Sequence, residues 1–74
     1  MIDYISLAKE YEEYADRIMQ RISVLSEQRA KSNSLDERHS IDVRLVSLRG
    51  LLREHRQIAN HLRKRGEKYL NRQD

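Results

Sequence analysis

Towards its C-terminal end the chain carries a series of basic and amide side chains that could bind phosphate groups. Five of them recur at intervals of three and four residues, so they would lie along one face of a helix, over about 20 Å at 1.5 Å per residue. Guanidinium groups pair well with phosphate oxygens, and such a face could follow a nucleic-acid backbone. The arginine strip, as we call this face, consists of Arg49, Arg53, Arg56, Asn60, Arg63 and Lys64. In the simpler interpretation these side chains flank a packing seam, with aliphatic stems on the core and charged ends in water.

The same region contains RQIANHL, residues 56–62, which resembles the first half of the helix-turn-helix DNA-binding motif. In that motif a small residue follows the leucine directly and turns the chain towards a recognition helix. Here Arg63 takes that place, Gly66 comes three residues later, and no second apolar run follows. We therefore interpret RQIANHL as part of a packing surface.

Acidic side chains gather near the start of the chain, at Glu12, Glu13 and Asp16. Their spacing resembles half of the metal-binding signature of the all-α nucleotide pyrophosphohydrolases, which implies carboxylates that hold Mg²⁺ against a triphosphate. The second half is missing, because the acidic residues between positions 36 and 42 do not repeat the Glu-x-x-Asp spacing. We interpret the group as a solvated acidic face that points outward and does not pair with the arginine strip. No metal, cofactor or small-molecule substrate is predicted.

Histidine and the remaining polar residues give no catalytic pattern. His55 lies at an apolar position where it should meet Tyr11 or Tyr14, so we expect a core histidine that is hydrogen-bonded to a tyrosine hydroxyl. His61 lies six residues further on and faces elsewhere, so the two rings cannot bind a metal ion together. No glycine-rich phosphate loop and no nucleophile beside a base is present. The sequence therefore predicts a protein that is not an enzyme.

The composition is that of long helices. The 74 residues include no Pro, two Gly and 36% charged residues, and they make one small domain, 1–74. Cysteine is absent, which excludes disulfides. No apolar run approaches the roughly 18 residues of a membrane span, and the first residues lack the pattern of a signal peptide. We expect a cytoplasmic protein.

The first of two predicted helices covers residues 3–31. From Tyr4 to Leu25 apolar residues recur at intervals of three and four, which is the pattern of an amphipathic helix. Asp3 suits the N-cap position, because its carboxylate can accept from the free N–H groups of the first turn. A polar Ser/Asn cluster follows and turns the chain.

The second predicted helix covers residues 35–70. Ser34 and Glu37 match the capping box, in which the hydroxyl and the carboxylate each accept from a backbone N–H. From Ile41 to Tyr69 the apolar stripe alternates steps of four and three without a slip. Gly50 lies off this stripe, and the sequence leaves open whether it kinks or breaks the helix.

The short turn predicts an antiparallel helical hairpin, which is an all-α fold. Folding about residue 33 would place Leu25 near Ile41 and Tyr11 near His55. Residues 66–74 would then overhang the start of the first helix.

Apolar residues beside the main stripes suggest that the hairpin is not the finished assembly. Two helices bury one stripe each, whereas wider apolar faces require further helices. A domain of this size also gains only a few kcal/mol from one core. We therefore expect a homodimer, as a four-helix bundle or coiled-coil assembly. The candidate interface residues are Tyr4, Tyr11, Met19, Leu51, Ile58, Tyr69 and Leu70.

Together these features predict a small helical interaction or regulatory protein that binds another macromolecule as a homodimer. A protein partner is favoured over nucleic acid, and no contact with a membrane is expected. The alternative is a nucleic-acid-binding helical bundle that uses the arginine strip.

Overall fold

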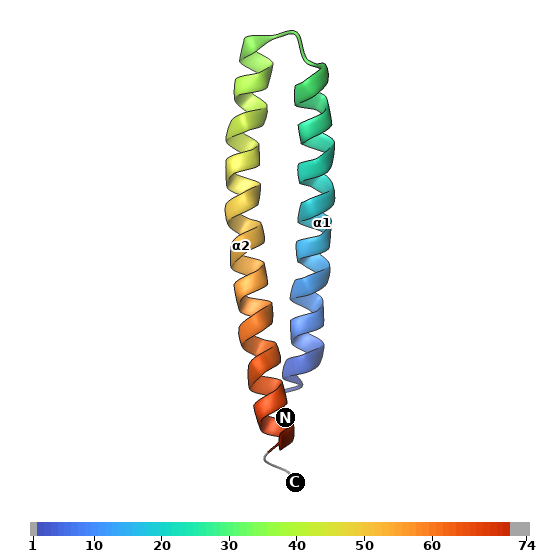
Figure 1. The fold of residues 1–74 in the computed structure, drawn as a ribbon, viewed down its shortest axis with the longest axis vertical. Coiled ribbons are helices and arrows are strands. Elements are labelled where there is room, and N and C mark those ends of the chain that lie inside the picture. Colours follow the sequence, from blue (N-terminus) through green and yellow to red (C-terminus); the bar gives the residue numbers. More distant parts are fainter. Residues whose placement is uncertain (1, 72–74) are drawn as a thin grey trace.

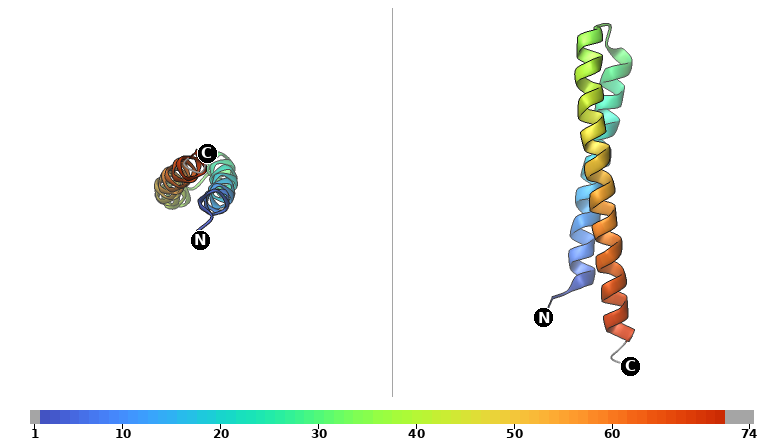
Figure 2. Two further views of the ribbon diagram at one scale, coloured as in Figure 1. Left: turned by 90° about the horizontal axis from the view of Figure 1, so that it is seen from below. Right: turned by 90° about the vertical axis from the view of Figure 1, so that its left-hand side faces the viewer.

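The computed structural model describes residues 2–71, which form two antiparallel α-helices joined by a short turn (Figure 1). Helix α1 spans Tyr4–Lys31 and helix α2 spans Leu35–Asn71. The molecule measures 60 × 16 × 14 Å, and in side view α2 crosses α1 at a small angle (Figure 2). The predicted all-α hairpin is confirmed, with helix bounds within one residue of those expected. Within the described residues, neither helix is long and apolar enough to cross a membrane.

Helix α1 begins at the predicted cap. The Asp3 carboxylate accepts from the Ser6 backbone N–H at 3.1 Å, and the Ser6 hydroxyl donates to it at 2.6 Å. These two hydrogen bonds stabilise the charged form, so they hold the pKa of the Asp3 carboxyl below its ordinary value.

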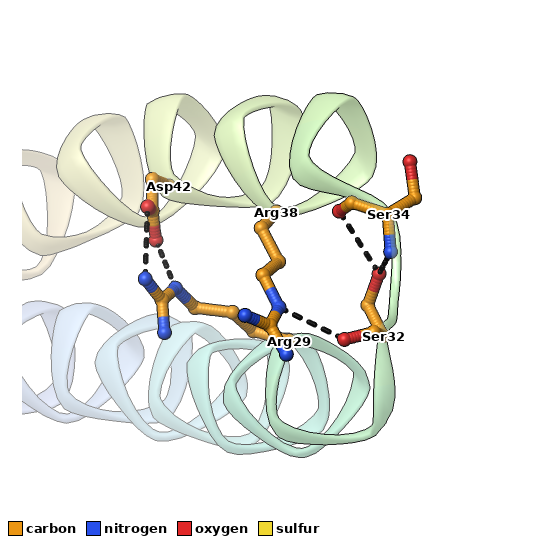
Figure 3. A network of polar contacts seen from close by, with 5 residues as sticks. All are labelled: Arg29, Ser32, Ser34, Arg38 and Asp42. Atoms are coloured by element: carbon orange, nitrogen blue, oxygen red, sulfur yellow. Dashed lines mark hydrogen bonds and ion pairs between the residues drawn. The ribbon is translucent and has the colours of Figure 1, made fainter.

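The turn between the helices is built on serine hydroxyls (Figure 3). Ser32 is buried, and its hydroxyl accepts from the Ser34 N–H at 3.2 Å, while the Arg38 side chain donates to the Ser32 carbonyl at 2.8 Å. The Ser34 hydroxyl accepts from the Glu37 N–H at 3.3 Å, which is the first half of the predicted capping box. The polar cluster seen in the sequence thus satisfies backbone groups at both helix ends.

Helix α2 continues through Gly50 without a break. A Cβ atom built at this position would meet nothing within 4 Å, so no close contact requires the glycine. Gly50 therefore does not break the helix, and within residues 2–71 there is no third one.

Large aliphatic side chains pack between the helices near the turn. Leu25, Ile41 and Leu45 are buried, and the half-buried Ile22 and Leu48 pack against them. The predicted proximity of Leu25 and Ile41 is confirmed. We call this part of the molecule the loop end.

Small residues take over towards the chain termini, in the part we call the open end. The buried residues there are Ala8, Ala15, Ala59 and Gly66. A Cβ built on Gly66 would come within 2.7 Å of the Ile5 side chain, so the two helices approach closely at this level. We predicted that residues 66–74 overhang the start of α1. This is wrong for Gly66, which packs against α1. The side chains of Tyr69 and Leu70 lie outside the described residues.

Two candidate binding faces of the hairpin

The pair of helices has two broad faces, one on each side of its packing seam. Residues that directly follow a seam residue, such as Arg56 after His55, border one face. Residues that directly precede one, such as Leu51 before Leu52, border the other. Contacts of Arg63 with Glu12 and of Arg56 with Met19 show that residues of the first set are neighbours across the two helices. We call the two sides the charged face and the apolar face.

An ion pair that the sequence did not predict joins the helices on the charged face. The Arg63 guanidinium donates to one Glu12 carboxylate oxygen, from Nε at 3.0 Å and from Nη2 at 2.6 Å. The expectation that Glu12 points outward, away from the arginine strip, is therefore wrong. Glu12 directly follows the seam residue Tyr11, so its side chain lies at the border of the seam and reaches the other helix.

Met19 lies on this face as well. Nη2 of Arg56 donates to its sulfur at 2.8 Å, and the Met19 side chain is 44% exposed. We predicted Met19 in one interface with Leu51 and Ile58. The structure separates them, because Met19 borders the charged face and the other two border the apolar face. Met19 instead supplies part of the surface on which an arginine of the strip rests.

A second ion pair, also missed in the sequence, ties α1 to α2 near the turn (Figure 3). Arg29 donates to Asp42 at 2.5 Å from Nε and at 3.3 Å from Nη2. This hydrogen bonding lowers the pKa of the Asp42 carboxyl and raises that of Arg29. Arg29 lies two residues before the end of α1 and Asp42 seven residues after the start of α2, so equal distance from the turn could not have predicted the pair.

The arginine strip is divided by these contacts into two parts. Towards the open end, a shallow groove of about 260 Å³ mixes strip residues with carboxylates, and it is lined by Glu12, Ala15, Asp16, Arg56, Ala59 and Asn60. Towards the turn, Arg49 and Arg53 are exposed, and among the described residues no carboxylate forms an ion pair with either. Lys64 is exposed in the same way. An anion could therefore contact Arg49 and Arg53 without displacing an ion-paired carboxylate, and the nearby charge that acts on Arg49 is that of Asp42.

The apolar face carries three large exposed side chains near the middle of the hairpin. Tyr14 is 50% exposed, Leu51 41% and Ile58 40%. Leu51 and Ile58 are seven residues apart and therefore lie on one line along α2. Tyr14 directly precedes the seam residue Ala15, so it borders the same face from α1.

Aromatic rings connect this face with the seam. The His55 ring lies 5.6 Å from the Tyr11 ring and 6.1 Å from the Tyr14 ring, which confirms the predicted proximity. The predicted hydrogen bond to a tyrosine hydroxyl is wrong. Nδ1 of His55 lies 2.9 Å from the Leu51 carbonyl oxygen, and because a carbonyl can only accept, Nδ1 carries the proton.

The other two predicted interface residues of α1 lie at the seam itself. Tyr4 and Tyr11 are half-buried between the helices, and the guanidinium of Arg65 stacks over the Tyr4 ring at 5.6 Å. Both tyrosines therefore serve mainly the contact within the hairpin. Of the predicted interface residues, Leu51 and Ile58 lie together on one exposed face.

A groove of about 600 Å³ continues this face towards the turn. Apolar and polar side chains both line it, and they are Arg21, Val24, Leu25, Gln28, Val43, Arg44, Ser47 and Leu48. Within residues 2–71, no three His, Asp or Glu side chains are placed so that they could hold a metal ion together.

Comparison of the chain with protein-family models, curated proteins and solved structures finds no match.

Proposed function

We propose that this chain is a non-enzymatic interaction protein that acts as a homodimer and binds another macromolecule, in the manner of a small regulator. The observation that carries the proposal is the amount of exposed surface. The hairpin exposes 6203 Å², whereas a compact monomer of 8.9 kDa exposes about 4,800 Å². The difference of about 1,400 Å² exceeds the roughly 800 Å² that each partner contributes to a typical protein interface.

The distribution of that surface supports binding to a macromolecule. One groove opens on each face of the hairpin, and three of the large exposed apolar side chains, Tyr14, Leu51 and Ile58, border the same face. A long flat surface of this kind suits a partner that contacts many residues at once, such as another helix. A protein partner is therefore the first candidate.

Sedimentation velocity over a range of protein concentrations tests the dimer. We expect a species of twice the chain mass at micromolar concentration, which dissociates on dilution because the interface is a bounded patch. A species of single-chain mass throughout the range, with helical circular dichroism retained, would contradict the proposal.

One observation favours a second candidate, the binding of nucleic acid. Arg49 and Arg53 are exposed without a carboxylate partner among the described residues, and Arg56 contacts a sulfur rather than an acid. Three such side chains could contact phosphates. Binding would then weaken about 40-fold between about 50 and 200 mM salt on a duplex, as expected for the release of counterions from three contacts.

Fluorescence anisotropy on labelled duplex DNA, single-stranded DNA and RNA tests this candidate. The informative variant is R49E/R53E, and the matched control is K31E/K68E, which changes the net charge equally at exposed positions elsewhere. A steep salt dependence and a larger loss of affinity in the first variant would support nucleic-acid binding. Equal losses in both variants would show only a general charge effect and would dismiss the arginine strip as a site.

A further inference from the structure

We propose that the apolar face formed by Tyr14, Leu51 and Ile58 is the surface on which a second copy of the chain docks. This inference rests on the homodimer proposed above and assigns it to one face of the hairpin. The charged face then remains on the outside of the assembly.

The spacing of the exposed residues fits a second packing seam. Leu51 and Ile58 repeat after seven residues, and each lies next to a residue of the seam within the hairpin, Leu52 and Ala59. A helix that carries two adjacent heptad stripes can pack on two neighbours at once, which is the arrangement in a four-helix bundle. In the hairpin Leu51 is 41% exposed and Ile58 40%, so this stripe still has apolar surface that a neighbouring helix could cover.

The opposite face is less suited to this contact. There the seam is bordered by the Arg63–Glu12 ion pair and by the Arg56 side chain on Met19. Burying these groups between two copies would require removing charges from water, which is costly unless each is paired again. Because the same face of both copies is used up in this contact, the assembly closes at two copies instead of growing into a filament.

Charges of both signs border the apolar face, as a two-fold contact requires. Glu54 lies between Leu51 and Ile58 in the sequence and on the same side of α2, because it is three and four residues from them. Arg21 and Arg44 lie nearer the turn, among the residues that line the groove. When a face of this composition meets a copy of itself, acidic and basic groups can be brought together at its rim.

The exposed area argues for a second copy as the occupant. The surplus over a compact monomer is present in every copy, and a partner copy removes it from both chains at once. Knobs-into-holes packing also requires a partner helix with a matching seven-residue repeat, and an identical α2 provides one. Docking would cover the exposed parts of Tyr14 and His55, which now lie at the edge of the seam.

The first test compares two double variants by sedimentation velocity. L51Q/I58Q removes two apolar side chains from the apolar face, whereas M19Q/V46Q removes two exposed ones from the charged face. We expect the first variant to weaken dimerisation at least about a hundredfold, since two buried aliphatic side chains are lost from each copy. The control should change it by less than about threefold. Equal effects, or a dimer unaffected by L51Q/I58Q, would overturn the inference.

A second measurement covers the case in which L51Q/I58Q fails to fold. The natural chain has no cysteine, so single thiols can be introduced as Leu51→Cys, Ile58→Cys and, as control, Val46→Cys. We expect the rate of maleimide labelling to fall several-fold with rising protein concentration at the first two positions and to stay constant at the third. Thiols at positions 51 and 58 that remain reactive in a dimeric chain would refute the assigned face and leave the homodimer intact. A chain that stays monomeric would refute both proposals.

Discussion

The two ends of the hairpin are packed with different kinds of residue. At the loop end, aliphatic side chains such as Leu25 and Leu45 fill the space between the helices. At the open end the buried residues are small, with Ala8 fully buried and Gly66 against α1. Large side chains hold two helices apart, and small ones let the backbones approach. The loop end therefore rests on buried apolar area, and the open end on the close fit of small residues such as Gly66 against side chains of the other helix.

This difference changes what a substitution does at each end. Removing atoms from the loop end leaves a cavity and loses hydrophobic stabilisation. Adding atoms at the open end forces the helices apart. Because the buried aliphatic side chains cluster at the loop end, that end carries much of the stability that the single hairpin can provide.

The largest effect is expected from Leu45→Ala at the loop end. Leu45 is 4% exposed and belongs to the aliphatic cluster, so its truncation should lower the free energy of unfolding by about 2–4 kcal/mol. Urea unfolding followed by circular dichroism, at one fixed protein concentration, measures the change. Val46→Ala is the control, because Val46 is 70% exposed and should change stability by less than about 0.5 kcal/mol. Similar losses in both variants would mean that the cluster is not the stabilising element.

The next effect concerns Gly66→Ala at the open end. The added methyl group would lie 2.7 Å from Cδ1 and 2.8 Å from Cγ1 of Ile5 and 3.3 Å from Cβ of Tyr4. We expect a loss of about 1–2 kcal/mol, which is overpacking of about 1–3 kcal/mol reduced by the better helix propensity of alanine. Thermal and urea unfolding both report it.

A second-site change separates the clash from other causes. Ile5→Ala removes the two nearest atoms, so Gly66→Ala should be less harmful in the Ile5→Ala background than in the natural chain. The coupling energy follows from a double-mutant cycle of the four proteins. Additive effects would show that the close approach of the helices is not what requires the glycine.

Gly50 provides the contrasting glycine. It lies in the middle of α2 with open space around its Cα, so Gly50→Ala has no clash to offset the gain in helix propensity. We expect this variant to raise the free energy of unfolding by up to about 1 kcal/mol. The same unfolding measurements apply. If alanine destabilised the chain at both positions, the contrast between Gly50, which has open space around it, and Gly66, which packs against α1, would not hold.

The helices and their register could be predicted because each depends on local or repeating signals. The cap at Asp3, the hydroxyl of Ser34 and the unbroken stripe of α2 fix the helix ends and the seam, and the register then follows from a short turn. The small residues of the open end were visible as part of the stripe. Their consequence, a close approach of the helices, required the geometry of Gly66.

The two faces were harder to predict, because residues on either side of a seam look alike in a helical pattern. Glu12 was expected to point outward and Met19 was grouped with Leu51, although both Glu12 and Met19 contact arginines of α2. Assigning a residue to a face requires knowing whether it precedes or follows its seam neighbour. The hydrogen bond of His55 was missed for another reason: the carbonyl four residues earlier competes with the tyrosine hydroxyls for the ring.

The smallest expected effect is the response to acid of the Arg29–Asp42 ion pair at the loop end. The guanidinium hydrogen bonds hold the pKa of Asp42 below its ordinary value, so the unfolded chain binds a proton more readily than the folded one. The contribution of the pair is therefore complete above the unfolded pKa of about 3.9 and is lost as the pH falls through the lower folded value. Ser6 lowers the pKa of Asp3 at the open end, so the stability that Asp3 contributes is likewise lost as the pH falls.

Asp42→Asn isolates the contribution of the loop end. At neutral pH this variant should be slightly less stable than the natural chain, because both side chains of the pair are about half exposed and such pairs contribute little. The difference should shrink towards zero well below about pH 3.9, where Asp42 is protonated in the natural chain too. Urea unfolding at neutral and acidic pH measures it, with Arg29→Gln as partner variant. The two substitutions should not be additive. A difference that stays constant with pH would assign the effect of Asp42 to something other than its charge.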